Sequence, residues 1–291
     1  MPLFCRHNRL TANCPICSRE MDAELRAKAP SSPARSRGAK SSSSRSSRSR
    51  GGVVTRKLAR AADDGYRNGL VPGLRATADA ERLAVALGAA AVRLEPPGPY
   101  PEVAAEPDLE EATWLAFLIA LAGPELREAV VAARPSWASG EAPDLPGDRA
   151  RTADAYRAWV DRAGTQAAAF QGDASWTPRR RFARVFERLA LPGFSRAARF
   201  ELLTGLGAAG RYELEAGELH LAAGEDATTE AAKRLLVSGD KLLLERRARD
   251  LADACGVPLA ALDRGLATWG APGPLDEAEA PAAIRAALAL R

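Results

Sequence analysis

A run of serine and arginine near the N-terminus divides this chain of 291 residues into parts that can fold and a part that cannot. Residues 31–52 contain almost no apolar side chains, so burial of this stretch cannot repay the conformational entropy lost on ordering it. We therefore expect a disordered basic linker at 21–54. It leaves a short N-terminal segment at 1–20, a helical body at 55–275 and a C-terminal tail helix at 276–291.

Positive charge is concentrated at the N-terminal end of the chain. Residues 1–60 hold 14 of the 41 Lys and Arg residues but only three of the 37 Asp and Glu residues, so the remainder is acidic. A basic arm on an acidic body suggests a polyanionic partner that the arm contacts. The arginines of the linker would follow nucleic-acid phosphates without reading sequence. A spacer that only improves solubility would have the same composition.

The distribution of apolar residues predicts that the protein does not interact with a membrane. The longest apolar run, at 114–123, is shorter than the ~18 residues that a membrane-spanning helix needs. The first residues lack the apolar core of a secretion signal. Unpaired cysteines fit a reducing compartment. We expect a monomeric, cytoplasmic protein associated with the nucleoid.

The N-terminal segment has the residues of a zinc knuckle. Cys5, His7, Cys14 and Cys17 lie within thirteen residues, and the last two have Cys-x-x-Cys spacing. Three thiolates and one imidazole complete a tetrahedral zinc site with no open position, so the pattern predicts structural zinc. The alternative is a redox Cys-x-x-Cys pair with His7 as a bystander. A redox pair of this kind is typical of a βαβ context, which the sequence lacks.

The body has helical periodicity with one exception. Residues 211–221 alternate apolar and polar side chains around Ala-Gly, which predicts a small β-hairpin. The fold class we expect is therefore mostly α with one hairpin. The expected helices span 77–94, 109–121, 152–170, 179–190, 226–236, 241–255, 259–269 and 282–290.

The segment 179–206 reads as a basic amphipathic helix, a tight turn and a second helix. Gly193 in the turn would let backbone N–H groups approach a phosphate, and the positive end of the second helix would add to the attraction. Ser195 and Arg196 follow at the start of that helix, and Arg180 lies on the outer face of the first. The alternative is a pair of helices that packs and binds nothing.

Two strings in this region resemble helix-hairpin-helix DNA glycosylases. LPGFSRAA at 191–198 is similar to their hairpin, and DATTEAAKRL at 226–235 is similar to the segment with their catalytic aspartate. The resemblance implies a glycosylase-like helical body with Asp226 as the counterpart of that aspartate. Ser195 replaces the second hairpin glycine, and Ala197 stands where bifunctional members have lysine, which argues against a Schiff-base lyase.

A closer resemblance covers residues 1–20 and 55–270. The chain is similar to the alpha-glutamyl/putrescinyl thymine pyrophosphorylases, clade three, which are grouped with the DNA glycosylases. The resemblance includes the N-terminal Cys and His pattern. The strings that carry it in the body are AADDGYRN at 61–68, WLAFLI at 114–119, GTQAAAF at 164–170, RFARVFERL at 181–189 and AAKR at 231–234.

This resemblance implies an enzyme that modifies a base in DNA. A small amine or amino acid would displace pyrophosphate from a pyrophosphorylated 5-hydroxymethyluracil that has left the base stack. Asp226 or Glu230 would accept a proton from the amine. The cations that would hold the leaving group are Arg180, Arg181, Arg184, Lys233 and Arg234.

Other interpretations remain open from the sequence. Asp226 in the form Asp-x-x-Thr is also typical of a helix N-cap, and the arginine face is also typical of a solvated helix surface. The same fold would suit base excision, with water attacking the sugar. It would equally suit a DNA-binding protein without enzymatic activity. His220, next to apolar Leu219 and Leu221, is expected to be a surface or packing residue and not a catalytic base.

Overall fold

The computed structural model describes residues 61–140, 145–275 and 279–291. The predicted knuckle, with Cys5, His7, Cys14 and Cys17, and the predicted linker lie outside these residues. The described part is mostly helical and contains no β-strand. Its elements are α2 (Thr77–Arg93), α3 (Pro101–Ala105), α4 (Leu109–Ala122), α5 (Arg127–Ala133), α6 (Arg149–Asp161), α7 (Gln166–Gln171), α8 (Pro178–Arg188), α9 (Arg196–Ala208), the short 3-10 helix η2 (Leu221–Ala223), α10 (Ala227–Leu236), α11 (Lys241–Cys255), α12 (Leu259–Gly270) and α13 (Ala282–Ala287).

The most apolar segment forms the central helix α4, as its sequence predicted. Asp108 caps the helix by accepting hydrogen bonds from the N–H groups of Glu110 and Glu111, both at 2.9 Å. Every residue of α4 from Ala112 to Ala122 is buried, which is what a helix that is apolar on all sides requires. No helix in the described part of the chain is both long and apolar enough to cross a bilayer.

The two glutamates in the first turn of α4 fix the segments that pack around it. The Glu110 carboxylate accepts from the N–H groups of Gln166 and Ala167 at 2.9 and 2.8 Å, which attaches α7 to α4. The Glu111 carboxylate accepts from the Trp137 N–H at 2.7 Å. A connected set of aromatic rings from several elements packs beside α4. Its members are Trp114, Phe117, Trp137, Tyr156, Trp159, Phe170, Phe194 and Tyr212.

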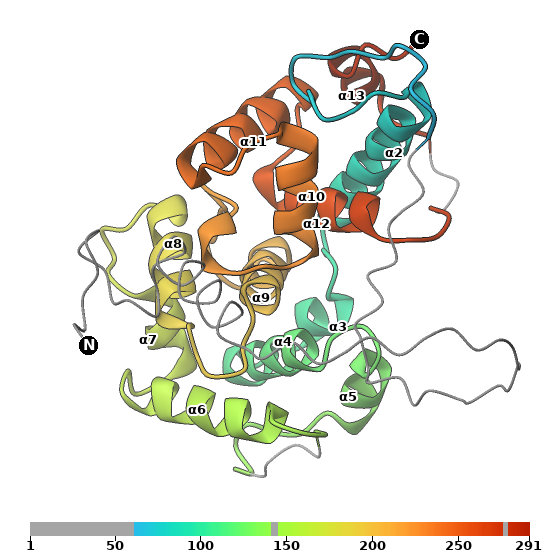
Figure 1. The fold of residues 1–291 in the computed structure, drawn as a ribbon. Coiled ribbons are helices and arrows are strands. Elements are labelled where there is room, and N and C mark those ends of the chain that lie inside the picture. Colours follow the sequence, from blue (N-terminus) through green and yellow to red (C-terminus); the bar gives the residue numbers. More distant parts are fainter. Residues whose placement is uncertain (1–60, 141–144, 276–278) are drawn as a thin grey trace, which may run out of the picture. The chain divides into compact units, whose positions relative to one another are not determined.

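The helices of residues 61–291 form two groups (Figure 1). Helix α2 packs with α10 to α13 in the first group, although it lies at the other end of the described sequence. Helices α3 to α9 form the second group around α4. The chain passes between the groups twice, after α2 and after α9. Residues from the two groups meet at the start of α9, where Arg196 contacts Asp226 and Asp263.

Two sequence predictions within this body were wrong. The helix expected at 152–170 is broken into α6 and α7 because Gly164 adopts a φ of +89°. Thr165 then starts α7 by accepting the Ala168 N–H at 3.0 Å.

The second wrong prediction is the hairpin at 211–221, which is an irregular loop in the structure. Side chains from other elements satisfy its backbone groups, so no partner strand is needed. The Glu245 carboxylate accepts from the N–H groups of Leu219 and Leu221 at 2.8 and 2.7 Å. Arg249 donates to the Gly217 carbonyl at 3.1 Å. The alternating apolar residues are buried as expected, but in a loop.

Candidate functional site

The turn between α8 and α9 is held rigidly and presents its backbone to solvent. Gly193 is exposed and has a φ of +76°, a conformation that favours glycine. The Thr152 hydroxyl donates to the Pro192 carbonyl at 2.8 Å, and the buried Phe194 ring packs on Phe117 with centroids 5.2 Å apart. Ser195 caps α9 by accepting the Ala198 N–H at 3.1 Å. The predicted helix, turn and helix are thus present.

This turn offers hydrogen-bond donors to an anion. Within the described residues, the backbone N–H groups of Gly193, Ser195 and Arg196 make no hydrogen bond. They lie at the N-terminal end of α9, where the helix dipole is positive. Ser195 supports the turn as a cap, so its substitution for the second glycine of the resembled motif does not disturb the helix start. An oxyanion such as a phosphate matches these donors.

Arg196 does not face this anion-binding turn, contrary to the sequence prediction. Its side chain is only 1% exposed, and each of its three nitrogens has a protein acceptor. Nε pairs with Asp226, Nη1 donates to the Leu219 carbonyl at 2.6 Å, and Nη2 donates to Asp263 at 2.8 Å. A guanidinium with all its nitrogens engaged inside the protein cannot bind a phosphate. Arg196 instead ties α9 to the loop before α10 and to α12.

Asp226 makes the helix cap and, in addition, a buried ion pair. One carboxylate oxygen accepts the Thr229 N–H at 2.9 Å as the N-cap of α10, and the other accepts from Arg196. Burial alone would raise the pKa of Asp226, but the hydrogen bonds from Arg196 and Thr229 outweigh it and hold the pKa below its ordinary value. The carboxylate therefore stays ionised at neutral pH, next to the α8–α9 turn.

Asp263 on α12 is a second carboxylate on the same guanidinium, and sequence reasoning missed it. Its side chain is 13% exposed. Burial raises its pKa to about 6, although the charge of Arg196 acts in the opposite direction. Two carboxylates that share one arginine thus differ in acidity, and such a difference is typical of functional sites. The sequence gives no local signal for Asp263, because its partner is 67 residues away.

Arg181 is also not available to a phosphate, although its position in the sequence suggested it. Its guanidinium donates to three backbone carbonyls, those of Gln171, Trp176 and Glu213, at 2.9 to 3.2 Å. The side chain is 10% exposed. Arg181 therefore fixes the loops on both sides of α8.

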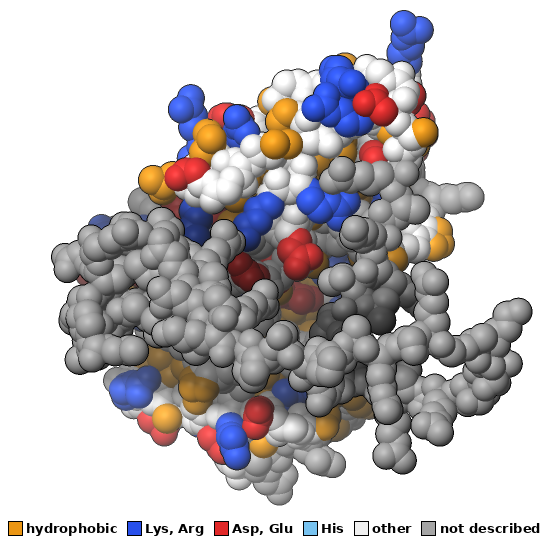
Figure 2. Space-filling model, in the orientation of Figure 1, with side chains coloured by type: hydrophobic (Ala, Val, Ile, Leu, Met, Phe, Trp, Pro, Cys, Tyr) orange, Lys and Arg blue, Asp and Glu red, His pale blue; other side chains and the backbone are white. Residues whose placement is uncertain are grey.

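The other predicted cations reach solvent. Arg180 is exposed and makes no hydrogen bond or ion pair within the described residues, although its charge acts on Asp173, while Arg184 pairs with Glu187 at 3.1 Å, an exposed contact of little energy. Lys233 is 3.7 Å from Glu225, and Arg234 lies over the Trp269 ring. These four cations come from helices of both groups. In Figure 2, basic side chains are likewise scattered over both groups, with acidic ones between them.

Glu230 is exposed on the first turn of α10, one helical turn after Asp226. Residues at this spacing lie on the same face of a helix. Glu230 has no ion pair within the described residues, so its carboxylate is free to interact with a ligand. Of the two acids predicted from the sequence, Asp226 has a carboxylate that is bound by Arg196 and Thr229, whereas the Glu230 carboxylate has no ion pair within the described residues.

His220 is a packing residue, as expected. Its ring stacks on Phe186 with centroids 4.0 Å apart and planes 12° from parallel. Burial, with a smaller contribution from the positive charge of Arg196, lowers its pKa to about 4. Among the described residues, no group of three or more His, Cys, Asp and Glu side chains is arranged to hold a metal ion.

The candidate site lies in a region of the chain that matches a known protein family. Residues 143–270 match the sequence model of the alpha-glutamyl/putrescinyl thymine pyrophosphorylases, clade 3. The match confirms the family resemblance. It runs from just before α6 to the end of α12, so the α8–α9 turn, Arg196, Asp226 and Asp263 all lie within it. No curated protein and no solved structure matches the chain at a significant level.

Proposed function

We propose that this protein modifies a thymine-type base in DNA. The observation that carries the proposal is the family match over residues 143–270, a segment that contains the exposed α8–α9 turn and the acids at the start of α10. A turn with free N–H groups suits a DNA phosphate, and acids beside it suit chemistry on a nearby nucleotide. Neither feature alone would separate an enzyme from a binding protein.

The reaction we propose is a displacement at the methylene carbon of pyrophosphorylated 5-hydroxymethyluracil. The amine nitrogen of a small co-substrate forms a bond to this carbon. The bond from the carbon to the pyrophosphate oxygen breaks, and pyrophosphate leaves with the electron pair. The nitrogen then loses a proton, which a carboxylate or water accepts. The base must first leave the duplex stack, at a cost of a few kcal/mol.

The described residues suggest a division of roles. Glu230 is the better proton acceptor because it is exposed and unpaired, whereas the carboxylate of Asp226 is stabilised by Arg196. Asp226 would remain ionised and stabilise positive charge near the reacting nucleotide. Arg180, Arg184, Lys233 and Arg234 are the cations that would hold the pyrophosphate or the DNA backbone, since their partners are exposed residues or an aromatic ring and not a buried network.

Base excision on a glycosylase-like fold is the second candidate, and one observation favours it. A carboxylate kept ionised beside a phosphate-binding turn is suited to stabilise positive charge on a sugar as its base departs. In that reaction water supplies the nucleophile, the bond from the sugar to the base breaks, and the free base leaves. The two candidates differ in product, so one assay separates them.

The test uses duplexes that carry either 5-hydroxymethyluracil or its pyrophosphate ester, incubated with the full chain and a mixture of amines. Nucleoside mass spectrometry should detect an amine adduct only on the ester, with release of pyrophosphate. A free base and an abasic site would instead support excision. If neither product forms, and the duplex is nonetheless bound, the enzymatic proposal fails and the protein is a DNA-binding protein.

Variants of the two acids assign their roles. Glu230→Gln should lower turnover about 100-fold with DNA affinity unchanged, in the range lost with a general base. Glu81→Gln, at an exposed position on α2, is the matched control and should have normal turnover. Asp226→Asn keeps a capping residue but loses the charge that faces Arg196. Normal turnover in both acid variants would contradict these roles.

For residues 1–20 we propose a structural zinc ion bound by Cys5, His7, Cys14 and Cys17. The support is the donor set, since three cysteines and one histidine suit a closed tetrahedral site. Elemental analysis of the purified full chain should find one zinc per chain, and Cys14→Ser should lose it. Cys255→Ser is the control, because Cys255 is buried in the helical body and should not change the zinc content. A full chain without zinc would refute the site.

A further inference from the structure

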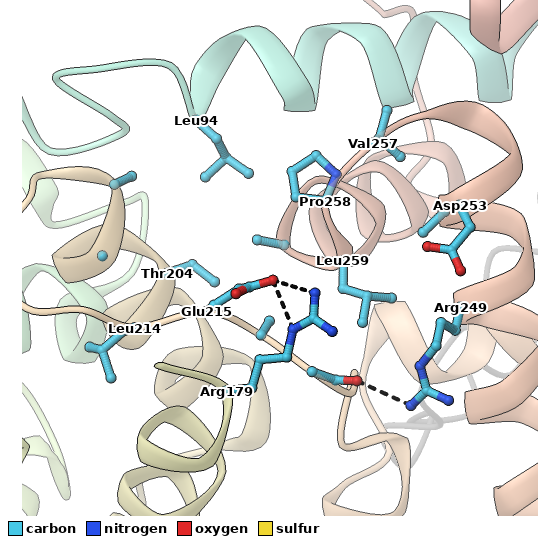
Figure 3. Close-up of a pocket in the computed structure, with 16 residues that line it drawn as sticks. Leu94, Arg179, Thr204, Leu214, Glu215, Arg249, Asp253, Val257, Pro258 and Leu259 are labelled. Carbon is cyan, nitrogen blue, oxygen red and sulfur yellow. Dashed lines mark hydrogen bonds and ion pairs between the residues drawn. The ribbon is translucent and has the colours of Figure 1, made fainter. Parts of the chain in front are cut away.

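A cavity between the two helix groups lies apart from the acids at the start of α10 (Figure 3). Its volume is about 490 Å³, within the range of small-molecule sites. The C-terminal ends of α9 and α11 form two of its walls, and the loop before η2 forms another. The residues that line it are Leu94, Arg179, Thr204, Gly207, Ala208, Leu214, Glu215, Ala216, Gly217, Arg249, Ala252, Asp253, Val257, Pro258, Leu259 and Ala260.

Apolar and polar surface contribute about equally to this lining. Leu94, Leu214, Val257 and Leu259 contribute aliphatic side chains from three separate parts of the chain, and alanine and proline residues lie between them. An aliphatic part of a ligand would lose water contacts here, and burial of apolar surface is worth roughly 25 cal/mol per Å². A strongly hydrated ligand, such as a bare phosphate, would not use this part of the cavity.

Four charged side chains surround the apolar part. Arg179 and Glu215 lie side by side at the cavity and form an ion pair at 2.6 Å, so they neutralise one another (Figure 3). Arg249 uses one of its terminal nitrogens for the Gly217 carbonyl at 3.1 Å. Its other donors are free. Asp253 has no hydrogen bond or ion pair to its side chain within the described residues.

Arg249 and Asp253 therefore present a cation with unused donors and an anion without a hydrogen bond or ion pair, although the charge of Asp253 is felt by Arg179. They are four residues apart on α11, so they are neighbours on one face of the helix. The two side chains are nevertheless not paired with each other, although this spacing allows it. A ligand that carries an ammonium and a carboxylate on the same carbon can satisfy both, with the ammonium at Asp253 and the carboxylate at Arg249.

We propose that this cavity binds the zwitterionic head of an α-amino acid with an aliphatic side chain. Asp253 binds the ammonium group, Arg249 binds the carboxylate, and the apolar lining contacts the side chain. The proposal does not depend on the reaction at Asp226 and Glu230, because it concerns binding alone. It holds whether or not the protein modifies DNA.

The experiment is calorimetric titration of the full chain with L-leucine and three relatives. N-acetyl-L-leucine lacks the positive charge, L-leucinamide lacks the carboxylate, and putrescine carries two positive charges and no negative one. We expect L-leucine to bind, and the two blocked derivatives to bind about tenfold more weakly or worse, as expected when a hydrogen bond to a charged group is lost.

Variants on α11 connect the binding to the two side chains. Asp253→Asn and Arg249→Gln should each weaken L-leucine about tenfold. Asp250→Asn and Arg246→Gln are the matched controls, since both are exposed on the same helix and do not line the cavity. All four changes are at exposed positions, so thermal melting should confirm an unchanged fold.

Each outcome decides the proposal. Binding of L-leucine that requires both charges and both α11 side chains supports it. No binding of L-leucine at millimolar concentration refutes it. Equal binding of putrescine and L-leucine also refutes it, because the cavity would then recognise amines in general. An equal loss of L-leucine affinity in the Asp250 and Arg246 variants refutes it too, because the effect would then lie elsewhere on α11.

Discussion

Arg196 and Asp226 form an ion pair that joins the first residue of α9 to the N-cap of α10, thirty residues further along the chain. The guanidinium also binds the Leu219 carbonyl and the Asp263 carboxylate. One side chain thus holds the loop between the two helices at Leu219 and Asp226 and ties it to α12 at Asp263. Apart from the short helix η2, the loop has no regular secondary structure, so these contacts help to determine where the acids at the start of α10 lie relative to the α8–α9 turn.

Removing the Arg196 guanidinium should strongly destabilise the protein. In Arg196→Met, two nearly buried carboxylates lose their common cation, and breaking a buried pair costs about 3–5 kcal/mol. Arg196→Lys should lose less stability than Arg196→Met, because lysine keeps the positive charge. It should still be less stable than the wild type, because one ammonium group cannot reach all three acceptors. Urea unfolding measures the free energy. Arg184→Met, on the exposed face of α8, is the control and should change it by less than about 1 kcal/mol. A loss of similar size in both variants would contradict the structural role of Arg196.

The exposed arginines of α8 should affect DNA binding and not stability. If Arg180 and Arg184 contact phosphates, Arg180→Gln with Arg184→Gln should reduce the slope of log affinity against log salt by about 2. Arg246→Gln, on α11, is the control for loss of a surface charge. Fluorescence anisotropy with a labelled duplex measures both. A slope equal to that of the wild type would show that α8 does not contact the DNA.

Local signals in the sequence predicted most helix ends correctly. Thr177 followed by proline begins α8, and Asp226 begins α10, because N-capping depends only on neighbouring residues. The buried helix α4 was equally predictable, since a segment apolar on all sides has only the core to occupy. The turn at Gly193 also followed from the sequence.

Long-range polar contacts could not be predicted in this way. Arg181 and Arg196 look like surface cations in the sequence, but carbonyls and carboxylates up to 67 residues away take up their donors. The alternating pattern around Leu219 predicted a strand, and the apolar residues are indeed buried. What the pattern could not show is that Glu245 supplies the acceptors that a partner strand would otherwise provide.

Gly193→Ala should destabilise the α8–α9 turn. An added Cβ would lie 2.5 Å from the Thr152 hydroxyl oxygen, and alanine would also have to adopt a φ of +76°. Strain of this kind costs about 1–3 kcal/mol. Gly210→Ala is the control, because Gly210 has a similar φ of +67° but open space around it. Urea unfolding should therefore give a larger loss for Gly193→Ala than for Gly210→Ala. Equal losses would mean that the contact with Thr152 does not constrain the turn.

Acid should destabilise the protein through His220, the only histidine among the described residues. The pKa of His220 is about 4 in the folded protein and near 6.5 when unfolded, so the unfolded chain takes up the proton first as the pH falls. Protonation of His220 therefore does not change the free energy of unfolding above pH 6.5. It lowers this free energy progressively between pH 6.5 and 4. His220→Phe keeps a ring stacked on Phe186 and removes this decline.

The measurement is urea unfolding of the wild type and His220→Phe at pH 7, 6 and 5. The variant should gain in relative stability at each step toward acid. Asp263, with a pKa raised to about 6, changes stability in the opposite direction over the same range, but it is present in both proteins and cancels in the difference. NMR titration of the His220 ring gives an independent value. A midpoint near 6.5, or a constant difference between the two proteins, would contradict the burial of His220 against Phe186.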